Sequence, residues 1–407
     1  MIKKIPVAQI RVGMYVSDVN AGWMDHPFLR NSLLLEDQEQ VLKIRRAGIR
    51  EVFIDTAKGL DVDDVPTAQE AARSSQQDLE RMAEAPENKA SPPRTSLAEE
   101  LAKAKGAFNE GARLVRSVMD NARLGRQIEM ESVKLAVEKI TNSVIRNSNA
   151  MFTLRRLQQR DDYTYQHSVG VCAMLAAFAK AMDMDLATIH QVALGGLLHD
   201  IGYVRIHAEI LAKPGKLTDE EYLHVKSHVV QGSDILHQTA GIPQLAFDIM
   251  EHHHERFDGS GYPRGLKGEE ISQVGRMAAI VDVYDAITTD RVYHRGVNPG
   301  EAMRKLFDWS KYHFDPALFQ IFVKSIGIYP VGTLVRLESE RLGVVVEQRE
   351  KNLLQPLVRV IYDAKRQYYL PPQDVDLSRP FGHGGGDRIV THESPLKWGI
   401  DVNRFLS

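Results

Sequence analysis

Histidine and aspartate residues on the apolar faces of successive helical segments constrain the fold of this chain more than any other feature. His167, for example, shares a helical face with Val171, Met174 and Phe178. The residues that concern us are His167, His199, Asp200, His228, His253, His254 and Asp282. Each alone is explained as well by a hydrogen-bonded core position. A buried group of them is costly unless its members are hydrogen-bonded or coordinate a metal, and so many together favour a metal. Because histidine and aspartate are common ligands of catalytic divalent metals, we expect a metal-dependent hydrolase.

Local patterns predict how some of these side chains are presented. Residues 218–221 have the pattern of a capping box, so we expect a helix that starts at 218 and carries His228 in its third turn. In the row of three histidines, His253 and His254 each follow an apolar residue by four positions and are predicted to face inward. His252 falls on the polar side of the same helix, so we expect it to take no part in a metal site.

Composition excludes several classes of protein. The chain has 407 residues, a hydrophobic fraction of 43% and a net charge of −3, so no overall basic field directs it to a nucleic acid polymer or an anionic membrane. The single cysteine, Cys172, excludes an intramolecular disulfide framework. The sequence contains no run of eighteen apolar residues that would predict a membrane span, and the N-terminus lacks the apolar core of a signal peptide. We therefore expect a cytoplasmic protein.

The pattern of hydrophobic residues predicts a mainly α protein with small mixed domains at both ends. The expected parts are an α/β accessory domain (1–57), a polar linker or frayed helix (58–96), a helical connector (97–160), a helical catalytic domain (161–327) and an antiparallel β extension with a tail (328–407). Strands are predicted at 12–16, 51–55, 333–337, 342–346, 357–362 and 367–370, and a helix at 36–47. The tail looks flexible, and Trp398 has no predicted place.

The long apolar stripes of the connector must be covered by something. Two arrangements are open: the stripes form the seam of a homodimer, or they pack onto the catalytic domain. The N-terminal domain carries no catalytic group that we can identify, so we expect it to be regulatory or to dock a protein partner.

Several ordered motifs resemble one known family. They are His-Asp-Ile-Gly at 199–202, Lys-Pro-Gly-Lys-Leu-Thr at 213–218, His228, His-His-Glu-Arg-Phe-Asp-Gly-Ser-Gly-Tyr-Pro at 253–263, Asp-Val-Tyr-Asp-Ala at 282–286 and Arg-Val-Tyr at 291–293. Together they resemble the HD-GYP class of HD-domain phosphodiesterases, over residues 150–327 or so. The resemblance implies an all-helical HD-type metal-dependent phosphohydrolase domain that hydrolyses cyclic-di-GMP to pGpG or GMP. The first sixty residues resemble an uncharacterised accessory domain found before such domains in bacteria.

The resemblance also implies a set of metal ligands. One metal would take His167, His199, Asp200 and Asp282, and the other would take Asp200, His228, His253 and His254, with Asp200 bridging. Asp200 and His199 would be the catalytic pair. We expect two divalent ions, iron or manganese before other metals. Two metals about 3.5–4 Å apart lower the pKa of a bridging water and clamp the phosphoryl oxygens of a phosphodiester.

Residues near these motifs are candidates for binding the substrate. They are Lys213, Lys216, Arg256, Asp258, Gly261, Tyr262, Asp285, Arg291 and Tyr203. Cations among them stabilise the charge of a phosphoryl transition state, and Arg291 matches a phosphate-binding position of the family. The simpler interpretations are solvated surface charges for the lysines and turn formation for the glycines.

The chain departs from the family pattern at several positions, among them His207, which stands where the family often has a proline. Tyr203 stands where the family has a lysine, and His294 stands where it has a second phosphate-binding cation. Tyr163 stands where some members have a glutamate that holds a third metal, so we expect two metals here. Two alternatives to an active phosphodiesterase follow: a catalytically impaired protein that senses cyclic-di-GMP, and an HD hydrolase that acts on nucleotide triphosphates or another phosphoester.

Overall fold

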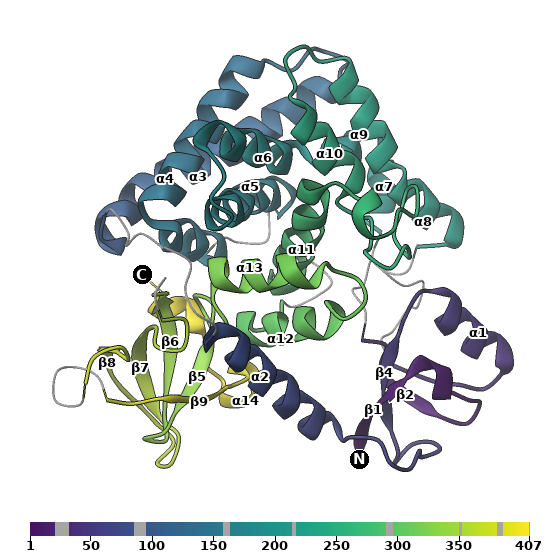
Figure 1. The fold of residues 1–407 in the computed structure, drawn as a ribbon, viewed down its shortest axis with the longest axis vertical. Coiled ribbons are helices and arrows are strands. Elements are labelled where there is room, and N and C mark those ends of the chain that lie inside the picture. The colour runs from purple at the N-terminus through teal and green to yellow at the C-terminus, as the bar shows by residue number, and fades with distance from the viewer. Residues whose placement is uncertain are drawn as a thin grey trace. The chain divides into compact units, whose positions relative to one another are not determined.

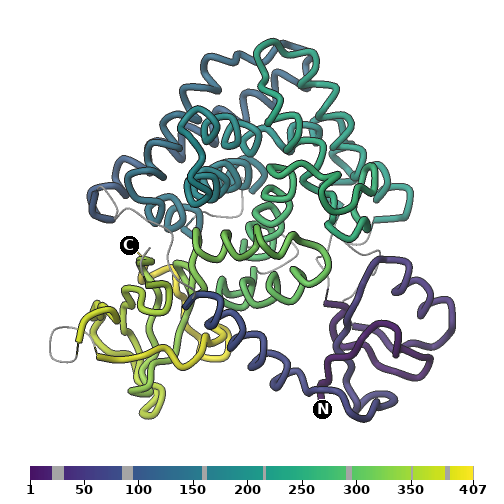
Figure 2. Tube along the Cα trace, in the orientation of Figure 1, coloured from purple at the N-terminus to yellow at the C-terminus, as the bar shows by residue number. Residues whose placement is uncertain are grey.

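The structure is a computed structural model that describes most of the chain (Figures 1 and 2). The described residues are 1–20, 32–84, 95–157, 163–213, 217–289, 296–349, 352–380 and 386–406. The chain divides into two compact units, one formed by residues 1–78 and 206–226 and the other by residues 79–205 and 227–407. The segment 206–226 therefore leaves the second unit between Asp200 and His228 and belongs to the first.

The first unit contains a four-stranded antiparallel sheet with the strand order β1-β4-β2-β3. Its elements are β1 (Ile2–Pro6), η1 (Val7–Gln9), β2 (Tyr15–Asp18), β3 (Leu33–Leu34), α1 (Gln38–Arg46), β4 (Glu51–Asp55), α7 (Ala208–Leu211) and α8 (Asp219–Lys226). The Asp37 carboxylate accepts a hydrogen bond from the Gln40 amide and caps α1. As predicted, α1 turns Val41 and Ile44 into the core of this unit. The predicted strand at 51–55 is confirmed, but β2 begins later than the predicted 12–16, because the chain turns at Gly13 with a φ of +92°.

The segment predicted as a polar linker or frayed helix contains a helix over residues 68–84. Helix α2 (Ala68–Glu84) begins at a capping box, in which the Glu70 amide donates to the Thr67 hydroxyl and the Thr67 amide donates to the Glu70 carboxylate. Its last turns are anchored in the second unit, where Leu79 is buried and the Tyr329 hydroxyl donates to Glu80 over 2.8 Å.

The second unit is built around a bundle of helices (Figure 1). They are α3 (Leu97–Arg123), α4 (Met130–Leu157), α5 (Tyr163–Ala181), α6 (Leu186–Leu198), η3 (Ile201–Arg205), α9 (His228–His237), α10 (Gln244–His252), η4 (Gly268–Glu270), α11 (Gln273–Thr288), α12 (Pro299–Trp309) and α13 (Pro316–Ile326). Helix α5 is buried almost all round, because it packs against α3, α4, α6, α11 and α13. The apolar stripes of α3 and α4 are covered within this same core. Of the two arrangements that the sequence left open, packing onto the catalytic domain is the one observed.

A five-stranded antiparallel sheet follows the helices, in the order β8-β7-β6-β5-β9. The strands are β5 (Leu334–Leu337), β6 (Arg341–Glu347), β7 (Leu357–Asp363), β8 (Tyr368–Asp376) and β9 (Ile389–His392), and the short helices α14 (Pro395–Trp398) and η5 (Val402–Phe405) end the chain. The four predicted strands are present, although β8 is longer than predicted. The prediction of a flexible tail is wrong where the tail is described, since β9 pairs with β5. Trp398 is held there by a hydrogen bond from its indole nitrogen to Glu393.

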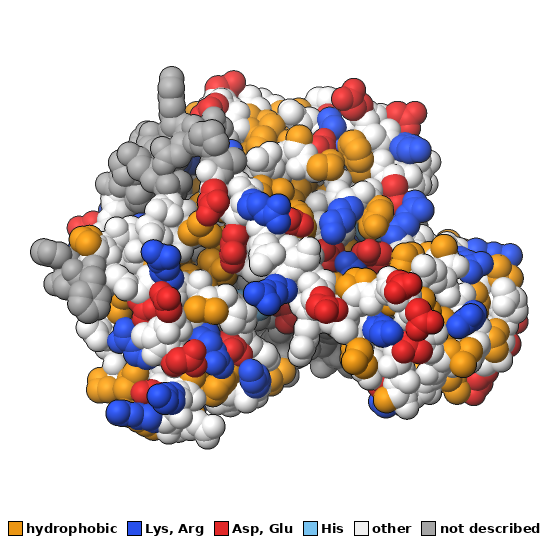
Figure 3. Space-filling model, turned by 60° about the horizontal axis from the view of Figure 1, so that its bottom comes forward, with side chains coloured by type: hydrophobic (Ala, Val, Ile, Leu, Met, Phe, Trp, Pro, Cys, Tyr) orange, Lys and Arg blue, Asp and Glu red, His pale blue; other side chains and the backbone are white. Residues whose placement is uncertain are grey.

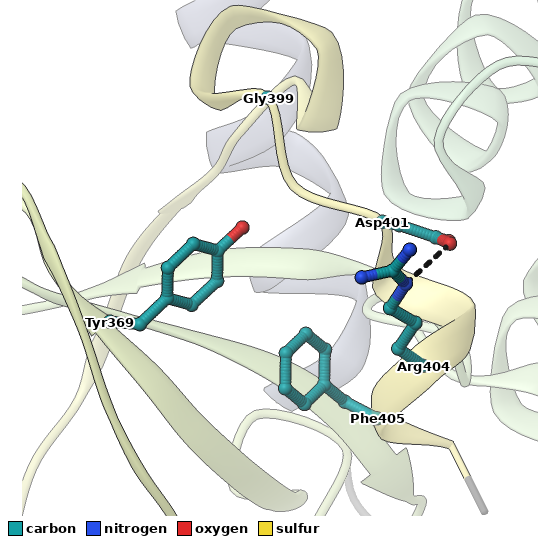
Figure 4. Close-up of a pocket in the computed structure, with 5 residues that line it drawn as sticks. All are labelled: Tyr369, Gly399, Asp401, Arg404 and Phe405. Atoms are coloured by element: carbon teal, nitrogen blue, oxygen red, sulfur yellow. Dashed lines mark ion pairs between the residues drawn. The ribbon is translucent and has the colours of Figure 1, made fainter.

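A hollow of about 370 Å³ lies at the edge of this β extension (Figure 4). It is lined by Tyr369, Gly399, Asp401, Arg404 and Phe405, and an ion pair of 3.4 Å joins Arg404 to Asp401. None of the site residues expected from the sequence lines it.

The described part of the chain contains no helix that is both long enough and apolar enough to cross a membrane. On the face shown in Figure 3, basic and acidic side chains are interspersed, in keeping with the net charge of −3.

Candidate metal centre

The expected metal ligands come from five segments of the second unit. His167 lies in α5, His199 caps the C-terminus of α6 and is followed by Asp200, and His228 is the first residue of α9. His253 caps the C-terminus of α10 and is followed by His254, and Asp282 lies in α11. All seven side chains are buried. Most of them sit at helix ends, where the chain changes direction and residues from different helices meet.

The seven residues form two groups that could each hold a metal ion. One group is Asp200, His228, His253 and His254, and the other is His167, His199 and Asp282. Within each group, one ligand atom per residue lies within 4.8 Å of all the others.

Asp200 lies between the two groups. Its Oδ2 is 3.3 Å from His199 Nε2 and 3.6 Å from His167 Nε2, whereas its Oδ1 is 3.5 Å from His228 Nε2 and 3.8 Å from His253 Nε2. The two carboxylate oxygens therefore face different groups, which is the arrangement that a bridging ligand requires.

The orientation of three imidazoles is set by hydrogen bonds on their outer nitrogen. Nδ1 of His199 donates to the Gly196 carbonyl over 2.8 Å, and Nδ1 of His253 donates to the Met250 carbonyl over 2.9 Å. Nδ1 of His167 donates to Asp285 over 2.6 Å. When such a ring is neutral, with Nδ1 carrying the proton, Nε2 has a lone pair to offer a metal.

The Nε2 atoms of His199, His228 and His253 face the centre in an arrangement that suits a bound cation. His228 Nε2 and His253 Nε2 lie 3.4 Å apart, and His199 Nε2 is buried with no hydrogen-bond partner among the described residues. Lone pairs that converge in a buried space are unfavourable unless a positive charge lies between them. The donor set of nitrogen and carboxylate oxygen suits divalent transition metals.

The pKa values in the centre follow from burial and from neighbouring charges. Burial, together with His199 and His228, lowers the pKa of His253 to about 3, so its imidazole is neutral at neutral pH. Burial raises the pKa of Asp200, but the surrounding histidines outweigh it and hold the pKa well below its usual range. Burial also opposes the charge of His167, but Tyr163 and the carboxylates of Asp282 and Asp285 raise its pKa well above its usual value. The carboxylates of Asp282 and Asp285 thus favour positive charge in the centre, on His167 or on a bound metal.

The helix that carries His228 differs from the prediction. The capping box is present, since the Thr218 amide donates to Glu221 and the Glu221 amide donates to the Thr218 hydroxyl. Helix α8, however, ends at Lys226, and His228 begins a new helix instead of lying in the third turn of the first. Gly202 of η3 fits against this new helix, because a Cβ there would lie 2.7 Å from the Gly232 amide.

His252 is excluded from both ligand groups, as expected, but it is not on a polar face. It is buried, and its Nδ1 lies 3.0 Å from the Ser272 hydroxyl at the start of α11. The prediction of its surroundings was wrong because α11 covers that side of α10, which helical periodicity alone does not reveal.

Three tyrosines pack on the ligand histidines. Tyr203 stacks on His228 with ring centroids 4.3 Å apart, and Tyr262 stacks on His254 at 4.6 Å. Tyr163 stacks on His167 at 5.5 Å. Two of these, Tyr203 and Tyr262, were expected to bind substrate, and they lie directly against the metal ligands.

Other expected substrate-binding residues hold the loop after the paired histidines together. Arg256 Nη1 donates to the Glu255 carbonyl, and its guanidinium lies 5.8 Å from the Phe314 ring. The Asp258 carboxylate accepts hydrogen bonds from the amide and hydroxyl of Ser260. Gly261 is needed for close packing, because a Cβ there would lie 2.5 Å from Glu255 Cα.

The remaining candidates belong to the first unit, lie behind a ligand or fall outside the described residues. Lys213 belongs to the first unit and forms an ion pair of 2.6 Å with Glu221. Asp285 is 1% exposed and lies behind His167, with no oxygen left for a substrate. Lys216 and Arg291 fall outside the described residues, as does His294.

Two residues at the centre were not foreseen from the sequence. Glu255 is 1% exposed, and its carboxylate accepts hydrogen bonds from the amides of Arg264 and Leu266, which closes the loop after the paired histidines. Glu255 directly follows the paired histidines in the sequence, and this position could have identified it as part of the site. Arg155, which bonds Asp285, is 130 residues away in the sequence and gave no signal.

Comparison with known proteins gives matches along nearly the whole chain. The HD domain matches residues 144–318, and a family described as Domain of unknown function (DUF3391) matches residues 2–133. A cyclic di-GMP phosphodiesterase of Pseudomonas aeruginosa is 44% identical over 400 residues, which cover 98% of this chain and 94% of that protein.

Two further matches cover less or are more distant. A 3′3′-cGAMP-specific phosphodiesterase of Vibrio cholerae is 34% identical over 193 residues, 47% of this chain and 43% of that protein. Among solved structures, an HDGYP protein of Bdellovibrio bacteriovorus is 18% identical and covers 79% of this chain and 98% of that chain, with a TM-score of 0.45.

Proposed function

Because the chain belongs to the family of HD-domain cyclic di-GMP phosphodiesterases, we propose that it hydrolyses cyclic-di-GMP to pGpG, GMP or both, with two bound divalent metals. The observation that carries this proposal is the convergence of seven buried histidines and aspartates into two adjoining groups that share the carboxylate of Asp200. We propose iron or manganese as the metals, because nitrogen and oxygen ligands without thiolate suit both.

The ligand sets expected from the sequence are supported by the geometry. His167, His199 and Asp282 would hold one metal, and His228, His253 and His254 would hold the other, with Asp200 contributing one oxygen to each. When bound, the metals supply Lewis acidity toward the phosphodiester and toward the attacking water. Asp200 and His199, which lie 3.3 Å apart, are the pair that we propose as catalytic.

The protein's own groups prepare this chemistry before substrate arrives. The outer hydrogen bonds of His167, His199 and His253 fix the tautomer of each ring, so no reorientation is needed when a metal binds. Burial keeps His253 neutral at neutral pH and available as a ligand. The seven side chains are buried, and the low local dielectric strengthens the electrostatic interactions among them.

Substrate contacts are proposed for a smaller set of residues than the sequence suggested. We propose that Tyr262, in the loop after the paired histidines, contacts a substrate bound at the metals, and its stacking on His254 supports this. Lys213, Lys216 and Arg291 stay predictions as phosphate-binding cations. Arg256, Asp258 and Gly261 shape the loop through the contacts described above, and we propose this structural role in place of a direct contact with substrate.

The first unit is proposed to regulate the enzyme and to dock a protein partner. The support is the segment 206–226, which groups with the first unit although it connects Tyr203 to His228. A signal received by the first unit thus has a covalent path to two residues at the metal centre. A homodimer and a cytoplasmic location stay predictions.

The experiment that tests the proposal is turnover of cyclic-di-GMP by the anaerobically purified full chain loaded with iron or manganese. We expect hydrolysis, with chromatography separating pGpG from GMP, and we expect the Asp200→Ala variant to lose it. 3′3′-cGAMP and a nucleoside triphosphate serve as comparison substrates and test for another specificity within HD hydrolases. Tight binding of cyclic-di-GMP without turnover, by protein that holds two metals, would favour the alternative of a sensor.

A further inference from the structure

We propose that Arg155 of α4 is a positioning residue for the metal centre, acting through Asp285 on the ligand His167. Arg155 Nε donates to Asp285 Oδ1 over 2.8 Å, and Arg155 Nη2 donates to Asp285 Oδ2 over 2.6 Å. The same Oδ2 accepts the hydrogen bond from His167 Nδ1, also over 2.6 Å. The three side chains are 7%, 1% and 3% exposed, so the whole chain of contacts is shielded from solvent.

Asp285 is not a member of either ligand group. Both of its oxygens are taken by Arg155, and one of them also by His167, so its task is to hold His167. A carboxylate behind a ligand histidine fixes the tautomer and ring orientation and raises the basicity of the ligand nitrogen. The orientation of Asp285 is in turn set by Arg155, because a two-pronged contact with a planar guanidinium leaves the carboxylate no freedom to rotate.

A glycine makes room for this ion pair. A Cβ at Gly170, on α5 three residues after His167, would lie 2.7 Å from Arg155 Nε and 2.8 Å from Asp285 Oδ1. Any side chain at this position would occupy the space where the two charged groups meet. The pair is therefore a built feature of the packing between α4, α5 and α11, and its effect on His167 extends the metal centre into the segment 97–160 that was expected to be a connector.

The inference rests on the metal-binding part of the proposed function, and its test measures metal binding directly. The variant is Arg155→Gln in the full chain. The matched control is Arg146→Gln on the same helix, because Arg146 also forms a two-pronged contact with a buried carboxylate, that of Glu100, at 2.6 and 2.8 Å. Glu100 bonds Ser143 and no ligand of the centre.

Metal-free proteins are titrated with Mn²⁺ in competition with a chelating dye. We expect wild type and Arg146→Gln to bind two ions alike, and Arg155→Gln to bind one of the two roughly 10–100-fold more weakly, the usual cost of losing a group that orients a ligand. Turnover of cyclic-di-GMP at limiting Mn²⁺ should fall in the same variant with KM unchanged. Arg155→Lys keeps the charge but not the two-pronged contact, so its Mn²⁺ affinity should lie between those of wild type and Arg155→Gln.

Two results would overturn the inference: Arg155→Gln binding both ions as tightly as wild type, or Arg146→Gln showing the same selective loss. If melting curves show that Arg155→Gln does not fold, the variant Arg155→Gln/Asp285→Asn replaces it, since it leaves no buried charge without a partner. This double variant should show the same selective weakening, and wild-type affinity for both ions would again overturn the inference. A wild-type protein that binds no metal would instead refute the proposed function.

Discussion

Tyr203 lies parallel to the imidazole of His228, with ring centroids 4.3 Å apart and 6° between the ring planes. Tyr203 stands where the HD-GYP class has a lysine, so the sequence suggested a lost phosphate contact. In the structure the tyrosine ring covers one face of the His228 imidazole, which limits the rotation of that imidazole. Tyr262 packs on His254 in the same way, with 22° between the planes.

Loss of the Tyr203 ring should weaken metal binding more than loss of its hydroxyl. Aromatic stacking contributes about 0.5–1.5 kcal/mol, so we expect Tyr203→Leu to weaken one of two Mn²⁺ sites by about 2–10-fold and Tyr203→Phe to leave both unchanged. Mn²⁺ titration of the three full-length proteins measures this. If Tyr203→Phe lost as much affinity as Tyr203→Leu, the hydroxyl and not the ring would be the important group.

Single ligand substitutions should separate the two metals. His167→Ala and His228→Ala each remove a ligand from one group only, so each protein should retain one tightly bound ion. Asp200→Ala removes a ligand oxygen from both groups, so this variant should bind neither ion tightly. Its turnover should fall at least about 100-fold, which exceeds the usual loss when only a group hydrogen-bonded to a ligand is removed. Metal analysis after desalting gives the number of ions per chain. Two ions retained by Asp200→Ala would show that Asp200 does not bridge.

The sequence predicted the helical fold and named the candidate ligands that the structure brings together, because both depend on local patterns. The spacing of apolar residues placed the helices, and the motifs at 199–202 and 253–263 named four of the ligands. What could not be predicted depends on distant contacts. Strand β9 pairs with β5 across about fifty residues, and its run of three β-branched residues, Ile389 to Thr391, is too short to predict a strand without that partner. The break at Ser227, which makes His228 the first residue of α9, falls in a stretch with no glycine or proline to mark it.

Substrate-binding residues were the least predictable part of the site. Asp285 was expected to face the substrate because it lies one turn after Asp282, but Arg155 and His167 take up its oxygens. Arg256 and Asp258 lie in the most informative motif, yet their described contacts are within or next to that loop. A motif indicates which residues belong to one site, but it does not distinguish residues that contact the substrate from residues that hold the loop in shape.

Gly261 should not tolerate a side chain, because a Cβ there would lie 2.5 Å from Glu255 Cα. Backbone atoms cannot move aside as a side-chain tip can, so we expect Gly261→Ala to destabilise the protein by about 1–3 kcal/mol, the usual cost of overpacking. Chemical denaturation measures the free energy of unfolding. Gly106→Ala in α3 is the control, since a Cβ there meets nothing within 4 Å, and it should stabilise the chain by about 0.5–1 kcal/mol. Equal effects of the two changes would contradict this packing argument.

The buried ion pair between Glu100 and Arg146 should make the stability of the helical unit depend on pH. Burial raises the pKa of Glu100, but hydrogen bonds from Arg146 and Ser143 outweigh it, so its pKa in the folded protein is below the usual value. A carboxylate with a lowered pKa stabilises the fold fully above its unfolded pKa, about 4.3, and this contribution is lost as the pH falls through the folded pKa. We expect Glu100→Gln to be about 1.5–3 kcal/mol less stable at pH 7, because it loses charged hydrogen bonds.

The difference between wild type and Glu100→Gln should shrink once the pH falls below about 4.3, because the wild-type carboxyl then takes up a proton as well. Urea denaturation at several pH values, with excess chelator so that metal release does not contribute, measures the difference. The control is Glu110→Gln, which breaks an exposed ion pair of 2.7 Å between Glu110 and Lys139 on the same two helices. Because exposed pairs contribute little, this control should change stability by less than about 1 kcal/mol at any pH. A gap between wild type and Glu100→Gln that stays constant from pH 7 to the acid limit would show that Glu100 contributes through its shape and not its charge.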